Sequence, residues 1–215
     1  MTRTVEFYFD VGSPTAYLAH KRLLQLQQPH NAQGHQPEAA NFSLRHRPML
    51  LGGVFKATGN QSPVAIPAKG AYMLQHDLPR FARRYGVTLN FNPHFPINTL
   101  QLMRGALAAE TLGCASLYID AVFEAIWVDA RDMGDATQVA ATLDAAGLDA
   151  QALLELAQSN VVKTALIDAT DAAVARGVFG APTMFVGDQM FFGQDRLDFV
   201  MEALEASVEA QPGHR

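Results

Sequence analysis

The first apolar stretch of the chain is typical of a buried β-strand that leads into a helix. Val5 to Val11, with the sequence VEFYFDV, is mostly aromatic or β-branched, and its short length and the following Gly12 favour a strand over a helix. Ser13 and Pro14 come next, and a serine at the N-cap with a proline at the first helical position is a strong start signal for a helix. Farther along the chain, Phe42 to His46, with the sequence FSLRH, can form a second strand. This part therefore predicts a β-α-β unit whose helix begins at Ser13 or Pro14.

The middle of the chain carries helical periodicity. Between residues 63 and 160 the apolar positions recur at spacings of three and four, and no strand is predicted there. A further amphipathic segment ends at Gly177. After it come two short apolar runs, APTMFVG and QMFFG, split by Gly187 and Asp188, and then a helical segment, DRLDFVMEALEASVEA. The later part of the chain therefore predicts a helix, two strands and a last helix.

These elements together predict the fold class and its division. A β-α-β half and a later β-β-α half, separated by inserted helices, describe an α/β protein with a thioredoxin-like sheet. We expect the thioredoxin-like domain to comprise residues 1–62 and 161–215, and the inserted all-helical domain to comprise residues 63–160. Residues 29–40 are rich in Gln, His, Asn, Gly and Pro and are predicted to form an exposed loop.

Composition and charge narrow the classes of function. The 215 residues are 49% apolar and 17% charged, which is enough for a well-buried core, and the net charge of -5 comes without a run of Lys or Arg. Nucleic acid is therefore not an expected partner. Glu6 and Asp10 precede any long apolar run, so we expect neither a signal peptide nor a membrane span there, and we expect a cytoplasmic protein.

The chain lacks the residues for redox or metal chemistry of its own. A single cysteine, Cys114, cannot form an intramolecular disulfide, and no Cys-x-x-Cys pair is present for dithiol exchange. The histidines have no metal-ligand spacing with Cys, Asp or Glu, so no metal is expected. A thiol that reacts at a site of this protein would have to be delivered by a bound cofactor.

The junction of the first strand and helix is the first candidate site. A helix N-terminus offers unpaired N–H groups and roughly half a positive charge, which favours an anion. A free thiol, with a pKa of about 8.5, becomes a better nucleophile when it is held there as a thiolate. Ser13 lies at this position, and its hydroxyl could donate a hydrogen bond to such a thiolate. The alternative is that Ser13 serves only as the N-cap.

A second candidate lies just before the first C-terminal strand. Ala181 and Pro182 form an X-Pro bond, which can be cis and leave the preceding backbone free to pair with an extended peptide. The alternative is an ordinary trans proline at the start of a strand.

Four motifs, in order along the chain, carry a family resemblance. They are FYFDVGSPTAYLA, GGVFKATGN, FPINTL with MRG, and VFGAPTMFVGDQMFFGQDRL. Over nearly its whole length the chain resembles the 2-hydroxychromene-2-carboxylate isomerases and the related kappa-class glutathione transferases, within the DsbA-like thioredoxin superfamily. The resemblance implies a DsbA-like fold, glutathione as the cofactor, and a homodimer.

By matching positions, the resemblance implies where the glutathione thiol would bind. Ser13 takes the place of the family's active-site serine, which contacts the glutathione sulfur, and Pro14 and Thr15 lie beside it. Thr15 stands where the family usually has an aromatic residue. Ala181 matches the residue before the family's cis-proline, here Pro182, and its backbone would pair with the cysteinyl part of the tripeptide.

Further matches imply the contacts at the two ends of the site. Asn60 matches an asparagine that contacts glutathione. Gln194 and Asp195 match the pair that holds its γ-glutamyl end, where a carboxylate suits the ammonium group, although Asp195 could instead be a helix N-cap. Lys56 matches a lysine near the aromatic substrate, and its alternative is a solvated loop lysine. Candidate lining residues of an apolar substrate cavity are Trp127, Phe91, Phe95, Met73, Met103 and Met190, although aromatic and Met positions at these spacings are more often core.

Three functions fit these residues. The leading hypothesis is a glutathione-dependent cis-trans isomerase that acts on a small aromatic carboxylate from aromatic hydrocarbon catabolism. The second is a kappa-like glutathione transferase that conjugates electrophiles, and the third is a non-catalytic thioredoxin-fold binding module. The matched asparagine and the Gln-Asp pair, on separate segments, favour a working glutathione pocket over the bare binding module.

Overall fold

The computed structural model describes residues 3–27 and 42–209, so the loop predicted at 29–40 lies outside the described residues. Its strands form a mixed sheet in the order β2-β1-β3-β4. β1 runs parallel to β2 and antiparallel to β3, and β3 pairs antiparallel with β4. The strands are β1 (Arg3–Phe9), β2 (Phe42–Pro48), β3 (Thr183–Val186) and β4 (Gln189–Phe192). This topology confirms the predicted thioredoxin-like sheet.

The first strand ends at Phe9 and not at the predicted Val11. The cause is a turn in which the Asp10 carboxylate accepts a hydrogen bond from the Gly12 N–H at 2.9 Å. The Asp10 carbonyl also accepts one from the Ser13 N–H at 3.0 Å. These local bonds take the place of strand pairing and direct the chain into the first helix.

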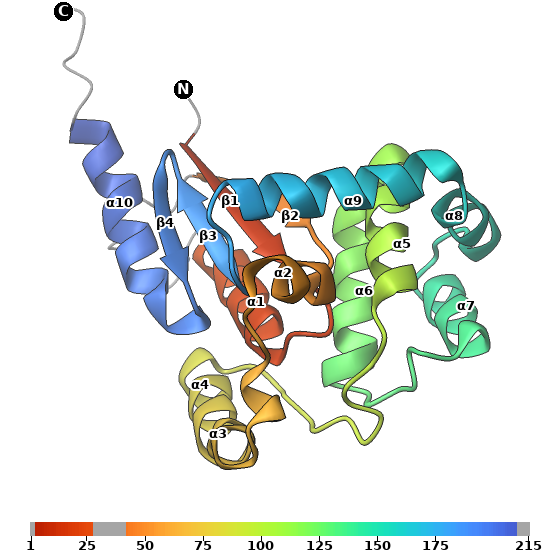
Figure 1. Cartoon of the computed structure of the whole chain (residues 1–215), viewed down its shortest axis with the longest axis horizontal. Helices are drawn as coiled ribbons and strands as arrows, with labels where there is room; N and C mark the ends of the chain where they lie inside the picture. The colour runs from red at the N-terminus through yellow and green to blue at the C-terminus, as the bar shows by residue number, and fades with distance from the viewer. Residues whose placement is uncertain (1–2, 28–41, 210–215) are drawn as a thin grey trace, which may run out of the picture.

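Helices cover both faces of the sheet and extend well beyond one end of it (Figure 1). α1 and α10 contact the sheet on one side, while α2 and α9 pack on each other and on the opposite side. The α-helices are α1 (Pro14–Gln27), α2 (Leu51–Thr58), α3 (Pro67–Tyr72), α4 (Leu78–Tyr85), α5 (Leu100–Thr111), α6 (Ala115–Trp127), α7 (Ala136–Ala145), α8 (Ala150–Ala157), α9 (Asn160–Ala175) and α10 (Leu197–Glu209).

Alternate residues of β1 explain the two layers, because successive side chains of a strand point to opposite faces. Phe7 and Phe9 are fully buried in the main hydrophobic core, to which α1 and α10 contribute. Tyr8 instead belongs to a smaller cluster with Val54 of α2 and Ala173 of α9. The apolar run is therefore buried on both faces, which is why its pattern lacks polar alternation.

Residues 63–160 contain no strand, as predicted. α3 and α4 are joined by a π-helical turn at Met73–Asp77 and lie apart from the group formed by α5 to α8 (Figure 1). Side-chain caps start several later helices: Asp135, Asp149 and Ser159 accept backbone hydrogen bonds in the first turns of α7, α8 and α9. The main core runs from β1 into α5, α6 and α8, and the division into two domains stays a prediction.

No helix in the described part of the chain is both long enough and apolar enough to span a bilayer.

Candidate active site

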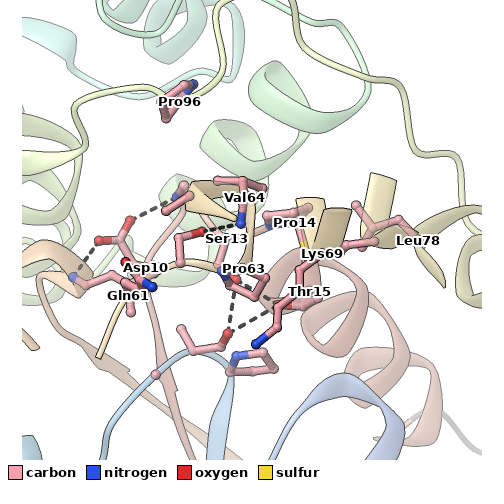
Figure 2. Close-up of a pocket in the computed structure, with 18 of the residues that line it drawn as sticks. Asp10, Ser13, Pro14, Thr15, Gln61, Pro63, Val64, Lys69, Leu78 and Pro96 are labelled. Carbon is pink, nitrogen blue, oxygen red and sulfur yellow. Dashed lines mark hydrogen bonds between the residues drawn. The ribbon is translucent and has the colours of Figure 1, made fainter. Parts of the chain in front are cut away.

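A cavity of about 1500 Å³ opens at the N-terminal end of α1. Its lining comes from distant parts of the chain: the β1–α1 junction, the start of α2, and segments within residues 60–78, 91–99, 179–182 and 192–196. Figure 2 shows Asp10, Ser13, Pro14 and Thr15 within this lining. The cavity therefore joins the N-terminal sheet half, the helical block and the C-terminal hairpin.

Ser13 is the N-cap of α1 and lines the cavity. Its Oγ accepts a hydrogen bond from the Ala16 N–H at 3.1 Å, and the residue is only 6% exposed. The same Oγ donates to the Ala181 carbonyl oxygen at 3.2 Å and lies 2.9 Å from the Thr15 hydroxyl. The predicted capping of α1 by Ser13 is thus confirmed. Because capping uses Oγ as an acceptor, the hydroxyl hydrogen stays able to donate to a ligand.

The Ala181–Pro182 peptide bond is cis, and both residues line the cavity. The Pro182 carbonyl accepts a hydrogen bond from the Gly193 N–H at 3.0 Å. Gly193 has a φ of 104°, which side chains rarely tolerate, and a β-carbon there would lie 2.5 Å from the Asp195 carboxylate. Glycine at this position therefore brings the Gln194–Asp195 segment close to the cis-proline.

The residues expected to hold the ends of glutathione also line the cavity. The Asn60 amide donates to the Phe179 carbonyl at 2.8 Å, which joins the end of α2 to the segment before the cis-proline. Gln194 is buried, and Asp195 pairs with Arg196 at 2.7 Å. Asp195 lies inside the 3-10 turn Gln194–Arg196, whose N-cap is Gly193, so Asp195 is not the N-cap of that turn. The structure brings Asn60, Gln194 and Asp195 to the same cavity as Ser13.

Two predicted residues lie elsewhere. Lys56 is exposed on α2 and is absent from the lining, whereas its neighbour Phe55 faces the cavity; successive residues of a helix point about 100° apart. Trp127 is 2% exposed, and its Nε1 donates to the Val11 carbonyl at 2.8 Å. Its ring packs against Phe95, which does line the cavity, at 5.6 Å between centroids. Trp127 therefore supports the wall from behind.

Asp10 is a site residue that sequence reasoning missed. Its carboxylate is 1% exposed and accepts three hydrogen bonds: from the Gly12 N–H at 2.9 Å, from the Leu51 N–H at 2.8 Å and from the Thr99 hydroxyl at 3.0 Å. Burial raises its pKa above the ordinary value of 3.8, although the three donors oppose this. Asp10 ties the Ser13 turn to α2 and to the start of α5. Its place in FYFDVGS, between the strand and the serine, was the available signal.

Gly12 is required beside Asp10 because the chain approaches Thr99 closely. A β-carbon at Gly12 would lie 2.8 Å from Thr99 Cγ2, which is closer than side-chain contacts allow. The turn before Ser13 therefore packs directly on the start of α5.

Lys69 is a further lining residue that the sequence did not identify, and an apolar wall lies beside it. Lys69 lies on α3, and Figure 2 shows it in the lining together with Pro63 and Leu78. Apolar and aromatic side chains cover the rest of this side; they are Phe55, Tyr72, Met73, Leu74, Phe91, Phe95, Pro96 and Ile97. The cavity thus has a polar region of hydroxyls, amides and a carboxylate, and an apolar region with a cation at its edge.

The buried His20 pairs with the half-buried His46 and with a carboxylate, away from the cavity. His20 Nε2 lies 2.8 Å from an Asp120 oxygen, and its Nδ1 lies 3.3 Å from His46 Nε2. Burial lowers the pKa of His46 to about 4. Among residues 3–27 and 42–209, no three His, Cys, Asp or Glu side chains are placed to hold a metal ion.

Known proteins share the fold and much of the sequence of this chain. Residues 4–205 match the family of DSBA-like thioredoxin domains. A 2-hydroxychromene-2-carboxylate isomerase of Sphingobium xenophagum is 34% identical, over 93% of this chain and 97% of its own length. Glutathione S-transferase kappa 1 of Homo sapiens is 30% identical, over 95% of this chain and 92% of its own. A solved structure of a 2-hydroxychromene-2-carboxylate isomerase superimposes with a TM-score of 0.82 at 30% identity, covering 97% of this chain and 100% of that one.

Proposed function

Because this chain belongs to the DsbA-like thioredoxin domains, and within them to the group of 2-hydroxychromene-2-carboxylate isomerases and kappa-class glutathione transferases, we propose that it is a glutathione-dependent cis-trans isomerase of the first kind. The protein is an enzyme related to isomerases over most of its length. The observation that supports glutathione as the cofactor is the polar region of the cavity, where Ser13, Asn60 and Asp195 line the same cavity as a cis-proline.

The chemistry of these residues fits glutathione. The Ser13 hydroxyl, at the positive end of α1, suits a thiolate. The amide of Asn60 and the buried Gln194 offer hydrogen bonds to a peptide, and the Asp195 carboxylate suits an ammonium group. Asp195 already pairs with a cation, Arg196, so the position accepts positive charge.

The protein's own residues bind and orient in this proposal. Glutathione held beside Ser13 would supply a nucleophilic thiolate for addition to a conjugated enone, and elimination after rotation about the resulting single bond would break the carbon–sulfur bond, re-form the double bond and return the thiol. Ser13 stabilises negative charge on the sulfur by donating its hydroxyl hydrogen. The apolar wall, which includes Phe95 and Met73, packs on the planar part of the substrate and excludes water. Asp10 holds the Ser13 turn in place from beneath.

We propose that Lys69 binds the carboxylate of the aromatic substrate, in place of Lys56. Lys69 lines the cavity on the side of the apolar wall, whereas Lys56 does not reach it. Lys69→Met should raise the KM for a carboxylate substrate about fivefold and leave kcat nearly unchanged, because an exposed ion pair contributes about 1 kcal/mol or less. Steady-state kinetics of Lys69→Met and Lys56→Met measure this directly. A larger increase in KM for Lys56→Met than for Lys69→Met would show that Lys56, and not Lys69, binds the substrate carboxylate.

The test of the proposed function uses a catalytic amount of glutathione with 2-hydroxychromene-2-carboxylate. We expect a spectral change of the substrate with no loss of free thiol and no adduct by mass spectrometry. We also expect glutathione to raise the melting temperature of the protein, since a ligand of the native state stabilises it by mass action. Absence of both binding heat and a thermal shift at millimolar glutathione would exclude the proposal.

The second candidate is a kappa-like glutathione transferase, which the 30% identity to the human kappa enzyme favours. The same polar region would serve, but the thiol would remain bonded to the electrophile. Stoichiometric thiol consumption and a stable adduct in the same assay would select this function. A binding module without catalysis would bind glutathione but would neither isomerise 2-hydroxychromene-2-carboxylate nor conjugate an electrophile.

We further propose a homodimer, as the family resemblance implies, and a cytoplasmic location, as the sequence predicts. Sedimentation equilibrium of the purified protein tests the dimer, and fractionation of cells that express it tests the location.

A further inference from the structure

Two hydroxyl groups, not one, converge at the polar end of the cavity. Ser13 Oγ and Thr15 Oγ1 lie 2.9 Å apart, and each lies 3.2 Å from the same Ala181 carbonyl oxygen. Figure 2 shows Ser13 and Thr15 together in the lining. We infer that Thr15 is a second hydrogen-bond donor to the bound thiolate, so that the sulfur is held by a pair of hydroxyls. This inference rests on the proposed function, because it requires a thiol ligand beside Ser13.

The position of Thr15 supports this role. Ser13 is the N-cap and Pro14 begins α1, so Thr15 is the second residue of the first turn, where the positive end of the helix favours an anion. Thr15 is half-buried and lines the cavity, so its hydroxyl is within reach of a ligand there. A ligand sulfur that contacts the Ser13 hydroxyl would therefore lie beside the Thr15 hydroxyl as well.

The hydrogen bonds already present leave both hydroxyls able to donate. Ser13 Oγ accepts from the Ala16 N–H, which fixes the oxygen but does not use its hydrogen. In the structure the two hydroxyls share one neutral acceptor, the Ala181 carbonyl. A hydroxyl hydrogen rotates about the carbon–oxygen bond, so either group can turn to a thiolate without moving a heavy atom. Hydrogen bonds to an ionised acceptor are about twice as strong as those to a neutral one, which favours the turn.

A second hydrogen-bond donor lowers the pKa of the bound thiol further than Ser13 and the N-terminus of α1 do by themselves. Each hydrogen bond to the thiolate lowers the pKa of the bound thiol, because it stabilises only the ionised form. Thr15 therefore increases the fraction of bound cofactor that is ready to react near neutral pH. A purely structural Thr15, which joined α1 to the Ala181 segment, would affect folding and leave that pKa unchanged.

The test compares Thr15→Val, which keeps the shape and removes the hydroxyl, with Thr15→Ser, which keeps the hydroxyl. The ultraviolet absorbance of the thiolate is titrated against pH with glutathione bound, beside thermal melts of each variant. We expect Thr15→Val to raise the apparent pKa of the bound thiol by about one unit, and Thr15→Ser to titrate like the wild type. We also expect the Ser13→Ala, Thr15→Val double variant to shift further than either single variant.

The outcomes separate this inference from the proposed function. If the wild type binds glutathione and Ser13→Ala shifts the titration, but Thr15→Val titrates like the wild type, the second donor is excluded and the isomerase proposal stands. If Thr15→Val and Thr15→Ser shift the titration equally, the shift does not depend on the hydroxyl, and the inference fails. If the wild type binds no glutathione, the proposed function itself falls.

Discussion

Ser13→Ala should slow turnover by roughly ten- to a hundredfold while glutathione affinity changes much less. A hydrogen bond to a charged group contributes about 1.5–3 kcal/mol, and this one acts on the charge of the reacting sulfur. The apparent pKa of the bound thiol should rise, since the ionised form loses a donor. Steady-state kinetics and a pH titration of the thiolate absorbance measure both effects.

The cap that Ser13 also provides needs its own control. Loss of the Ala16 hydrogen bond should cost about 1 kcal/mol of stability, whatever happens at the sulfur. Ser159 caps α9 in the same way, by accepting from the Val162 N–H at 3.3 Å, and lies outside the cavity lining. Ser159→Ala should therefore lower the melting temperature similarly and leave turnover intact. If the two variants lose the same small amount of activity, Ser13 is only a cap.

Asp10→Ala should destabilise the protein by about 3 kcal/mol or more. It would leave the buried Thr99 hydroxyl and the half-buried Leu51 and Gly12 N–H groups without their acceptor, and each unsatisfied group costs about 1–3 kcal/mol when it is buried. Urea unfolding measures the change. Asp135, an exposed residue that caps α7 with one hydrogen bond, is the matched control, and Asp135→Ala should cost about 1 kcal/mol. Similar losses of unfolding free energy for Asp10→Ala and Asp135→Ala would show that the Asp10 network adds no more stability than a single helix cap.

Asp10 should also make the stability of the protein depend on pH. Burial raises the pKa of Asp10 in the folded protein above its value in the unfolded chain, so the folded state binds a proton at this carboxylate more strongly than the unfolded state does. The contribution of this group is therefore fully present below about pH 4, near the unfolded pKa, and is lost as the pH rises through the folded pKa. Asp10→Asn does not titrate, so the stability of the wild type relative to Asp10→Asn should fall across that window. A difference independent of pH would contradict the raised pKa.

The local structure around the site followed from residues that are neighbours in the sequence. Ser13 and Pro14 predicted the start of α1, and Gly187 with Asp188 predicted the turn between β3 and β4, because caps and turns depend on bonds within a few residues. The absence of strands between residues 63 and 160 followed from apolar spacing alone. The motif resemblance, in turn, identified Ser13, Asn60, Ala181 and Asp195, which the fold brings to one cavity.

The tertiary structure decided the rest, because those contacts join residues far apart in the chain. The sequence predicts only that Asp10 lies near the end of a strand, and the packing of the fold places Leu51 and Thr99 around its carboxylate. Likewise, spacing does not say which face of α2 meets the cavity. The fold turns Lys56 to solvent and brings Lys69 to the lining, while the core takes Trp127 as a support behind the wall. Local bonds are encoded by neighbouring residues, but the direction of a side chain depends on what the whole fold packs beside it.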